Sequence, residues 1–287
     1  GNRGSLSWVA QGDFGARRQL SKSFHWANQL QLRFGQTAAQ LDDPDDPAKT
    51  IWSKPVKSDD QILAETVGIL TKGWAVDPYV SVRFDSQFID VSDPRKHLWF
   101  NPMRFNEALG VAYRVSRGDA RESFWRAGLG LRQTLSKTFV GLVGDETTTD
   151  VAQEGGLQIS GDTKWTFAGD RITYLGKLLV FFPFIYNGSD DLDEYNRLSQ
   201  ANDPTRESVN DYWRSPTFDW QNTFSSNITS WLAVNLYLRF VYEKYDVTTK
   251  LDLDQPIDEL DALVDSAIRK SVQYQQTLGI GLSYRFL

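Results

Sequence analysis

The stretch "WLAVNLYLRFVYE" (231–243) decides the fold, because large apolar residues and polar residues alternate along it. The apolar set is Leu232, Val234, Leu236, Leu238, Phe240 and Tyr242, and the residues between them include Asn235, Tyr237, Arg239 and Glu243. A period of two residues is the pattern of a β-strand whose two faces meet different surroundings. One such strand fits a soluble sandwich as well as a membrane barrel, so its recurrence matters.

The same alternation recurs along almost the whole chain and predicts eleven strands. They lie at about 5–19, 24–40, 58–72, 78–91, 104–117, 121–138, 153–169, 171–187, 215–229, 231–247 and 270–287. The last contains "TLGIGLSYRFL" (277–287), in which Leu278, Ile280 and Leu282 alternate with small residues. A soluble core would have to bury one apolar face from each of these strands.

The connections alternate between short and long. Short ones fall near 21–23, 73–74, 118–119, 169–170 and 229–230, and long ones cover about 42–57, 92–103, 139–152, 188–214 and 248–269. Tight turns at one end and long loops at the other are typical of outer-membrane barrels. We therefore expect an all-β fold, a transmembrane antiparallel up-and-down β-barrel, as a single domain over 1–287. Antiparallel closure needs an even number of strands, which predicts about twelve, with the first either lying upstream of Gly1 or pairing irregularly.

Composition narrows the class of protein. The 287 residues carry a net charge of −6, so the basic excess of a nucleic-acid binder is missing. The chain has no cysteine, which removes disulfides and thiolate metal sites from consideration. No apolar run is long enough for a membrane-spanning helix, but a barrel conceals its apolar content at every second residue. The chain begins at Gly1 without a signal peptide, and we expect an export signal to have been removed.

The polar face of the strands predicts the lining of the barrel. Its charged residues are Arg33, Glu65, Arg83, Asp85, Arg114, Arg126, Arg132, Lys164, Lys177, Arg239, Glu243 and Arg285, with Asp162 and Asp219 in the same phase. Two functions are consistent with these charged residues. Excess positive charge would attract anionic solutes into a channel. Alternatively, the charges pair and fill a small barrel.

The long loops are acidic, in "LDDPDDP" (41–47), "GDETTTD" (144–150), "SDDLDE" (189–194) and "LDLDQPIDELD" (251–261). Their spacing does not match an EF-hand calcium loop, so we expect solvated loop charge and no metal site. Residues 256–270 predict a short helix, with Pro256 at its start and Ile257, Leu260, Val264 and Ile268 at helical spacing.

Enzyme chemistry has little support in the sequence. Only two histidines occur, and the strand order places His25 and His97 at opposite ends of the barrel. A two-histidine metal site is therefore not expected, and no nucleophile is singled out for a barrel hydrolase. We expect no catalytic residue and no cofactor.

The C-terminal residues resemble the assembly signal of outer-membrane barrels, which typically ends on an aromatic residue. Here Gly281, Tyr284 and Phe286 would form it, and Leu287 follows as the one departure. The resemblance implies recognition by the barrel-assembly machinery.

Several longer stretches together carry a family resemblance. They are "FHWANQLQLRFG" (24–35), "KSDDQILAETVGILT" (57–71), "FNEALGVAYRV" (105–115), "GGLQISGDTKWTFAGDRITYLGKLLVFF" (155–182) and the opening stretch. The chain resembles a porin-like family of Bacteroidota outer-membrane β-barrels of unknown function. The family pattern has a tryptophan-led second strand, a paired aspartate opening the third and an asparagine-led penultimate hairpin, matched by Trp26, Asp59 with Asp60, and Asn235. That family has no assigned catalytic residues, so none carry over.

These observations predict an integral protein of a Gram-negative outer membrane. It would be a porin-like channel for small polar or anionic solutes, or a structural subunit of a larger outer-membrane complex. The implied partners are outer-membrane lipid and lipopolysaccharide, the barrel-assembly machinery and other outer-membrane proteins, with no nucleic acid. The alternatives are a soluble β-rich binding protein and a barrel hydrolase.

Overall fold

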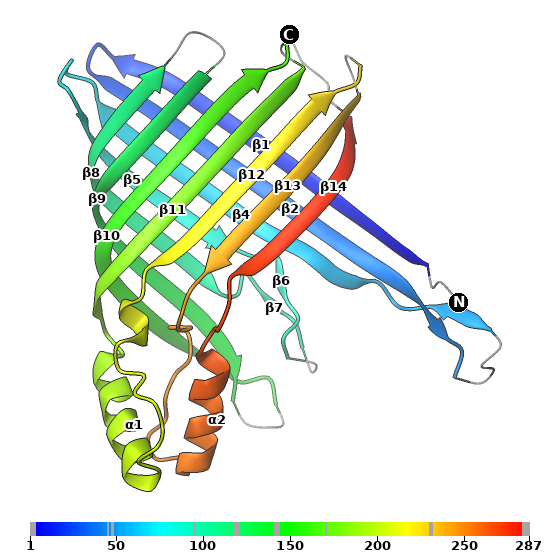
Figure 1. The fold of residues 1–287 in the computed structure, drawn as a ribbon, viewed down its shortest axis with the longest axis vertical. Helices are drawn as coiled ribbons and strands as arrows, with labels where there is room; N and C mark the ends of the chain where they lie inside the picture. The colour runs from blue at the N-terminus through cyan, green and yellow to red at the C-terminus, as the bar shows by residue number, and fades with distance from the viewer. Residues whose placement is uncertain are drawn as a thin grey trace. The chain divides into compact units, whose positions relative to one another are not determined.

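The computed structural model describes residues 4–44, 46, 49–93, 96–116, 121–140, 144–169, 171–229 and 232–282. Eleven long strands dominate it (Figure 1). They are β1 (Ser5–Ser21), β2 (Phe24–Asp42), β4 (Val56–Leu70), β5 (Asp77–Ser86), β8 (Met103–Ser116), β9 (Arg121–Phe139), β10 (Thr147–Phe167), β11 (Ile172–Tyr186), β12 (Thr217–Asn227), β13 (Leu232–Tyr242) and β14 (Gln273–Leu282). Each corresponds to one of the eleven strands expected from the alternation.

These strands form one antiparallel sheet in the order β1-β2-β4-β5-β8-β9-β10-β11-β12-β13-β14, so each pairs with its neighbours along the chain. The short strand β3 (Thr50–Trp52) pairs with β2, and β6 (Ile89–Asp90) pairs with β7 (Leu98–Trp99) in a separate hairpin. The predicted all-β, up-and-down fold of a β-barrel is confirmed. Within the described residues β1 and β14 are the two edges of the sheet, and the further upstream strand stays a prediction.

The two faces of the sheet differ as the alternation predicts, with the apolar face exposed. On β14, Leu278 and Ile280 are 70% and 77% exposed. On the opposite face, Arg126 and Arg132 of β9 are only 4% and 5% exposed. Soluble proteins bury apolar side chains and leave arginine outside, so the usual distribution is inverted here.

The chain divides into two compact units. One comprises 1–68, 81–106 and 134–151, and the other 69–80, 107–133 and 152–287. In the first, the carboxylate of Asp60 accepts hydrogen bonds from the backbone N–H groups of Phe88 and Ile89, at 2.7 and 3.0 Å. The ammonium group of Lys57 lies 3.3 Å from the same carboxylate. These contacts fix the chain where β5 stops and the β6–β7 hairpin begins.

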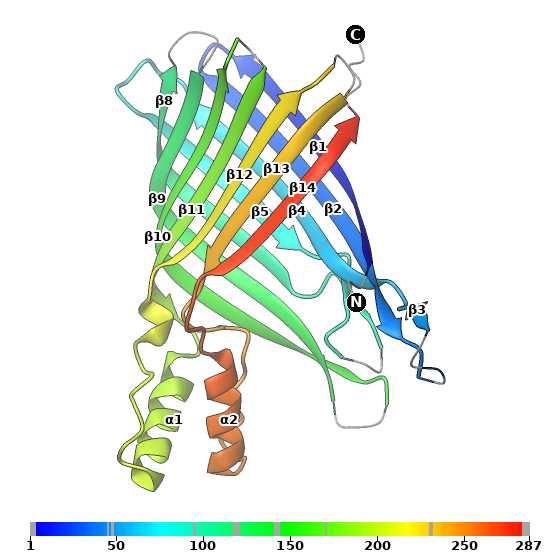
Figure 2. The same ribbon diagram turned by 45° about the vertical axis from the view of Figure 1, so that its right-hand side comes forward.

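In the second unit, two long connections fold together into a helical module, defined as residues 188–214 and 243–270. Helix α1 (Ser189–Asn202) lies beside helix α2 (Ile257–Ala267) beyond the ends of β11 to β13, as both ribbon views show (Figures 1 and 2). A short 3₁₀ turn, η1 (Tyr212–Arg214), precedes β12. None of the described helices is long and apolar enough to cross a membrane.

The helical module has a conventional apolar core. Its buried members are Leu192, Tyr195, Val209, Trp213, Tyr245, Val247, Leu251, Leu260, Val264 and Ala267, joined by Tyr186 at the end of β11. The helix expected within 256–270 is present, with Leu260 and Val264 on its buried face. The alternation predicts a long loop at 188–214, whereas residues 189–202 form α1. Its apolar face is confined to Leu192 and Tyr195, which is a weak helical signal.

Replacing Leu260 with alanine should destabilise the helical module by about 2–5 kcal/mol, because it leaves a cavity in the module's core. Leu260 is 1% exposed. Glu259→Ala, at the adjacent exposed position, should stay within about 0.5 kcal/mol of the parent protein. Protease cleavage within 188–214, measured against urea concentration, checks both values. Equal sensitivity of the two variants would contradict this packing.

Candidate functional site

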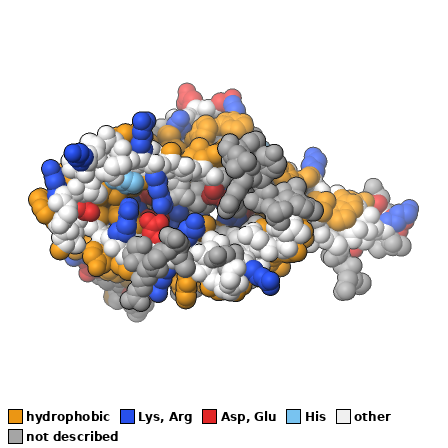
Figure 3. All heavy atoms as spheres, turned by 90° about the horizontal axis from the view of Figure 1, so that it is seen from above, with side chains coloured by type: hydrophobic (Ala, Val, Ile, Leu, Met, Phe, Trp, Pro, Cys, Tyr) orange, Lys and Arg blue, Asp and Glu red, His pale blue; other side chains and the backbone are white. Residues whose placement is uncertain are grey.

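The polar face of the sheet holds most of the charged residues that the sequence singles out. The end-on view of Figure 3 shows Lys and Arg side chains gathered next to Asp and Glu side chains, with hydrophobic side chains in separate patches. Arg33, Arg126 and Arg132 are at most 5% exposed on this face, and a buried charge requires a partner. The arrangement of ion pairs is therefore the main chemical feature of the face.

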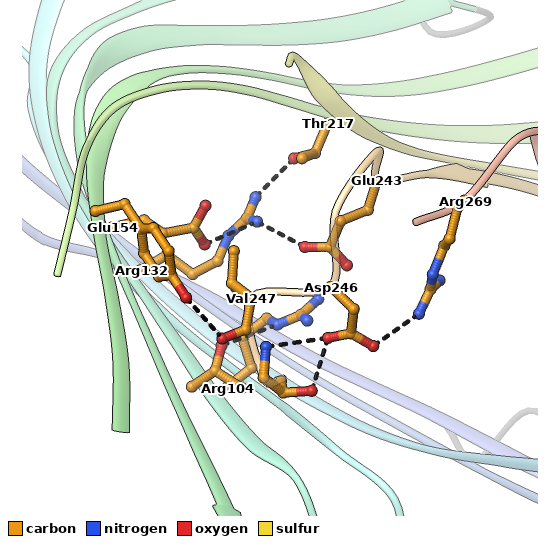
Figure 4. Close-up of polar contacts among 11 residues, drawn as sticks. Arg104, Arg132, Glu154, Thr217, Glu243, Asp246, Val247 and Arg269 are labelled. Atoms are coloured by element: carbon orange, nitrogen blue, oxygen red, sulfur yellow. Dashed lines mark hydrogen bonds and ion pairs between the residues drawn. The ribbon is translucent and has the colours of Figure 1, made fainter. Parts of the chain in front are cut away.

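The most elaborate group surrounds Arg132 in the second unit (Figure 4). Its Nη1 lies 3.3 Å from Oε2 of Glu154 and 3.3 Å from Oε1 of Glu243. Its Nη2 donates to the hydroxyl of Thr217 at 2.8 Å, and the guanidinium lies 4.4 Å from the ring centre of Phe181. These five residues, the Arg132 cluster, come from β9 to β12 and the residue after β13.

Burying the charges of the Arg132 cluster has a high free-energy cost. One cation faces two carboxylates, and every charged side chain in it is at most 8% exposed. Removing each ion from water costs several kcal/mol, which only close pairing and hydrogen bonds offset. The face of Phe181 adds a cation–π contact to the same guanidinium. The cluster therefore ties β9, β10, β12 and the chain after β13 to one another.

Two further ion pairs of the second unit also place an arginine of the polar face beside a carboxylate on the neighbouring strand. Arg126 of β9 lies 3.0 Å from Asp162 of β10 and is 4% exposed. Arg239 of β13 contacts both carboxylate oxygens of Asp219 on β12 at 2.9 Å. A bidentate pair of this kind fixes the orientation as well as the distance of its partners. Each pair joins neighbouring strands across the polar face.

The first unit repeats the pattern with different residues. Arg33 of β2 and Asp59 of β4 lie 2.5 Å apart, and their side chains are 4% and 9% exposed. Arg83 and Asp85, both on β5, are also 2.5 Å apart and partly buried. Asp59 belongs to the paired aspartate that the family resemblance singles out.

The remaining residues expected on this face are more exposed or fall elsewhere. Glu65 and Lys177 are half-buried, while Lys164 is exposed and Arg114, 52% exposed, lies 3.9 Å from Glu122. Gly281 lies on β14 opposite Ala233. Arg285, Tyr284 and Phe286 lie outside the described residues, so the assembly signal stays a prediction.

Sequence reasoning missed several partners of the buried arginines. Glu154, Thr217 and Phe181 were not singled out, although Glu154 lies in phase with Gln158 and Asp162 on β10. That phase was the available signal. The alternation of β10 runs unbroken through Glu154, whereas the facing strand β11 carries one extra residue, Phe184, at a register shift that the sequence does not reveal.

No group of three or more His, Cys, Asp or Glu side chains within the described ranges is placed to hold a metal ion. His25, through its Nδ1, lies 3.3 Å from the side-chain oxygen of Gln19 at the β1–β2 end of the sheet. The Arg132 cluster contains no side chain of a common nucleophile except the Thr217 hydroxyl, which accepts from Arg132. Its geometry supports cross-linking of strands.

The helical module contains tyrosines whose hydroxyls are held in the neutral form. Burial raises the pKa of Tyr245 above its usual value of 10.0, and the nearby carboxylate of Asp246 adds to the effect. Burial likewise raises the pKa of Tyr195, whose hydroxyl donates to Asp261 at 2.8 Å. Deprotonation of either side chain would place a negative charge in the module's core.

Replacing Arg132 with methionine should destabilise the protein by about 3–5 kcal/mol, because Glu154 and Glu243 lose their shared cation while buried. The triple variant R132M/E154Q/E243Q should recover most of this loss. Urea unfolding of the purified protein gives both values. Arg114→Met, at an exposed ion pair, should change stability by about 1 kcal/mol or less. A triple variant no more stable than R132M would contradict the assigned cause.

The module should lose stability as pH rises above 10.0, the usual tyrosine pKa, because the folded state holds its tyrosines protonated. Below that pH the stabilisation is fully present. Tyr245→Phe should raise the pH midpoint of alkaline unfolding, since the buried Tyr245 hydroxyl has no hydrogen-bond partner among the described residues. Tyrosinate absorbance follows the transition. Tyr113→Phe, at an exposed site, should leave the midpoint unchanged, and a Tyr245→Phe midpoint equal to the parent's would refute the assignment.

Comparison with models of known protein families and with curated proteins returns no match. The resemblance to Bacteroidota outer-membrane barrels therefore stays a prediction from the sequence. The interpretation of the polar face depends on its geometry.

Proposed function

We propose that this chain is an integral β-barrel protein of a Gram-negative outer membrane. The observation that supports it is the inverted distribution of side chains, with apolar residues on the exposed face and paired charges on the buried one. Apolar side chains facing lipid and polar side chains facing the interior are the arrangement of a membrane barrel. In water, the same exposed face would be an aggregation hazard.

Strand length and aromatic placement support the same proposal. The apolar stripe of β13 runs from Leu232 to Tyr242, and a tilted strand needs about 9–11 residues to cross the hydrocarbon layer. Aromatic rings contact one another on this face, with Trp220 and Phe240 5.6 Å apart and Phe240 and Tyr274 5.1 Å apart. Nearer the short β10–β11 turn, Trp165 and Phe167 lie 5.5 Å apart. Such rings suit the two interfaces of a bilayer.

Within this class, the ion pairs favour a structural subunit over an anion-selective channel. Five arginines of the polar face contact carboxylates, namely Arg33, Arg83, Arg126, Arg132 and Arg239. Paired charge leaves little field to draw anions inward. The barrel would then act as a scaffold, with lipid, lipopolysaccharide and other outer-membrane proteins as its partners and the assembly machinery as its insertion route.

Membrane fractionation tests the proposal. The protein should stay in the membrane pellet through alkaline carbonate and high salt, and should dissolve only in detergent. Unheated samples should migrate differently from boiled samples on gels, because a membrane barrel resists unfolding by cold detergent. A protein that is soluble in buffer without detergent would instead identify a soluble β-barrel.

The structural role is tested separately with purified, heat-modifiable protein in planar lipid bilayers. We expect no steady anion-selective conductance, because these five arginines are paired with carboxylates. An anion-selective current that disappears in Arg239→Gln would overturn the structural role and leave the membrane location intact.

A further inference from the structure

The apolar face of the first unit carries an open hollow of about 520 Å³, a volume within the range of about 300–1,000 Å³ seen for small-molecule sites. Its lining comes from β1, β2, β4, β5 and β8. The side chains of Phe14, Leu30, Val82, Phe84 and Phe105 belong to the apolar phase of these strands. Gly15, Gln29 and Glu65, of the other phase, also line the hollow, but its large apolar side chains lie on the face of the sheet away from the ion pairs.

Small side chains create this hollow. Ala16 and Ala64 line it where the surrounding strands carry large residues. Phe84 and Phe105 form one wall, with ring centres 5.1 Å apart. Phe14, 59% exposed, stands on the other side. The result is an open hollow with mostly apolar walls, which suits an apolar chain.

A cation lies on the same face, toward the β1–β2 turn. Arg18 follows Ala16 in the same strand phase and pairs in register with Trp26. It is exposed, and no carboxylate contacts it within the described part of the chain. The indole N–H of Trp26 donates to the hydroxyl of Thr66 at 2.8 Å, and Thr66 lines the hollow. Along the strands, the apolar hollow is followed by the hydrogen-bonded indole of Trp26 and then by the exposed guanidinium of Arg18.

We propose that this surface binds one anionic phospholipid, with an acyl chain in the hollow and the headgroup phosphate on Arg18. Arginine binds phosphate oxygens through two parallel N–H donors, which a zwitterionic headgroup would weaken by its own cation. Tryptophan beside the cation suits the boundary between acyl chains and headgroups. The inference rests on the proposed membrane location, since only there does this face meet lipid.

Native mass spectrometry of the detergent-purified protein tests the site. The protein is first shown to be heat-modifiable, then mixed with equal amounts of phosphatidylglycerol and phosphatidylcholine. The parent protein should retain one phosphatidylglycerol per chain, with several-fold less phosphatidylcholine. Ala64→Phe, which fills the hollow, should lose both lipids at least tenfold. Arg18→Gln should retain lipid but lose the preference for phosphatidylglycerol.

Two matched variants serve as controls. Ala127→Phe adds the same ring to the exposed apolar face of β9, outside the hollow, and Arg171→Gln removes an exposed arginine at another short turn. Both should bind lipid as the parent does. Equal retention by Ala64→Phe and Ala127→Phe would overturn the site. Equal retention of the two lipids by the parent would overturn the role of Arg18. Lipid-free dimers that Ala64→Phe dissociates would assign the hollow to a second copy instead. Loss of heat-modifiability in the parent would count against the membrane location, separately from the site.

Discussion

Every buried guanidinium on the polar face must meet a carboxylate, and the arrangement of the strands depends on this requirement. Arg132 satisfies it with Glu154 and Glu243, and Arg33 satisfies it with Asp59. An isolated buried charge would cost more free energy than one apolar contact returns. Since successive residues point to opposite faces, a slip of one residue would move each arginine onto the apolar face. The pairs therefore fix the register between strands.

The same requirement explains the inverted exterior. Charges that hold strands together from one face leave the other face free to be apolar, as it is on β13 and β14. The proposed membrane location would also require the sheet's backbone groups to be bonded between strands, as they are along the pairing of β1 with β2. The two faces of the sheet therefore have different roles. Ion pairs on the polar face fix the register of the strands, and apolar side chains on the other face suit the lipid contact that we propose for it.

The sequence predicts the strands well because a period of two residues is a local signal that survives any tertiary arrangement. The eleven strands and helix α2 were recovered from residue spacing. Helix α1 was missed because Leu192 and Tyr195 form only a short apolar stripe among acidic residues. The partners of Arg132 could not be predicted, since Glu243 lies 111 residues away in the sequence and the phase of β10 places Glu154 on the polar face without showing which cation it meets. Residue type identifies which side chains carry charge, whereas strand register determines which of these side chains form ion pairs.

The helical module has a consequence for the order of folding and for lifetime. Its two halves are far apart in sequence, because the hydrogen bond from Tyr195 to Asp261 spans 66 residues. Strands β12 and β13 lie between the two halves in the sequence and their pairing brings the halves together, so we expect the module to close late. Contacts formed after the rate-limiting step slow unfolding more than they speed folding. We therefore expect the module to close on a sheet that has already formed, and to slow unfolding more than it speeds folding.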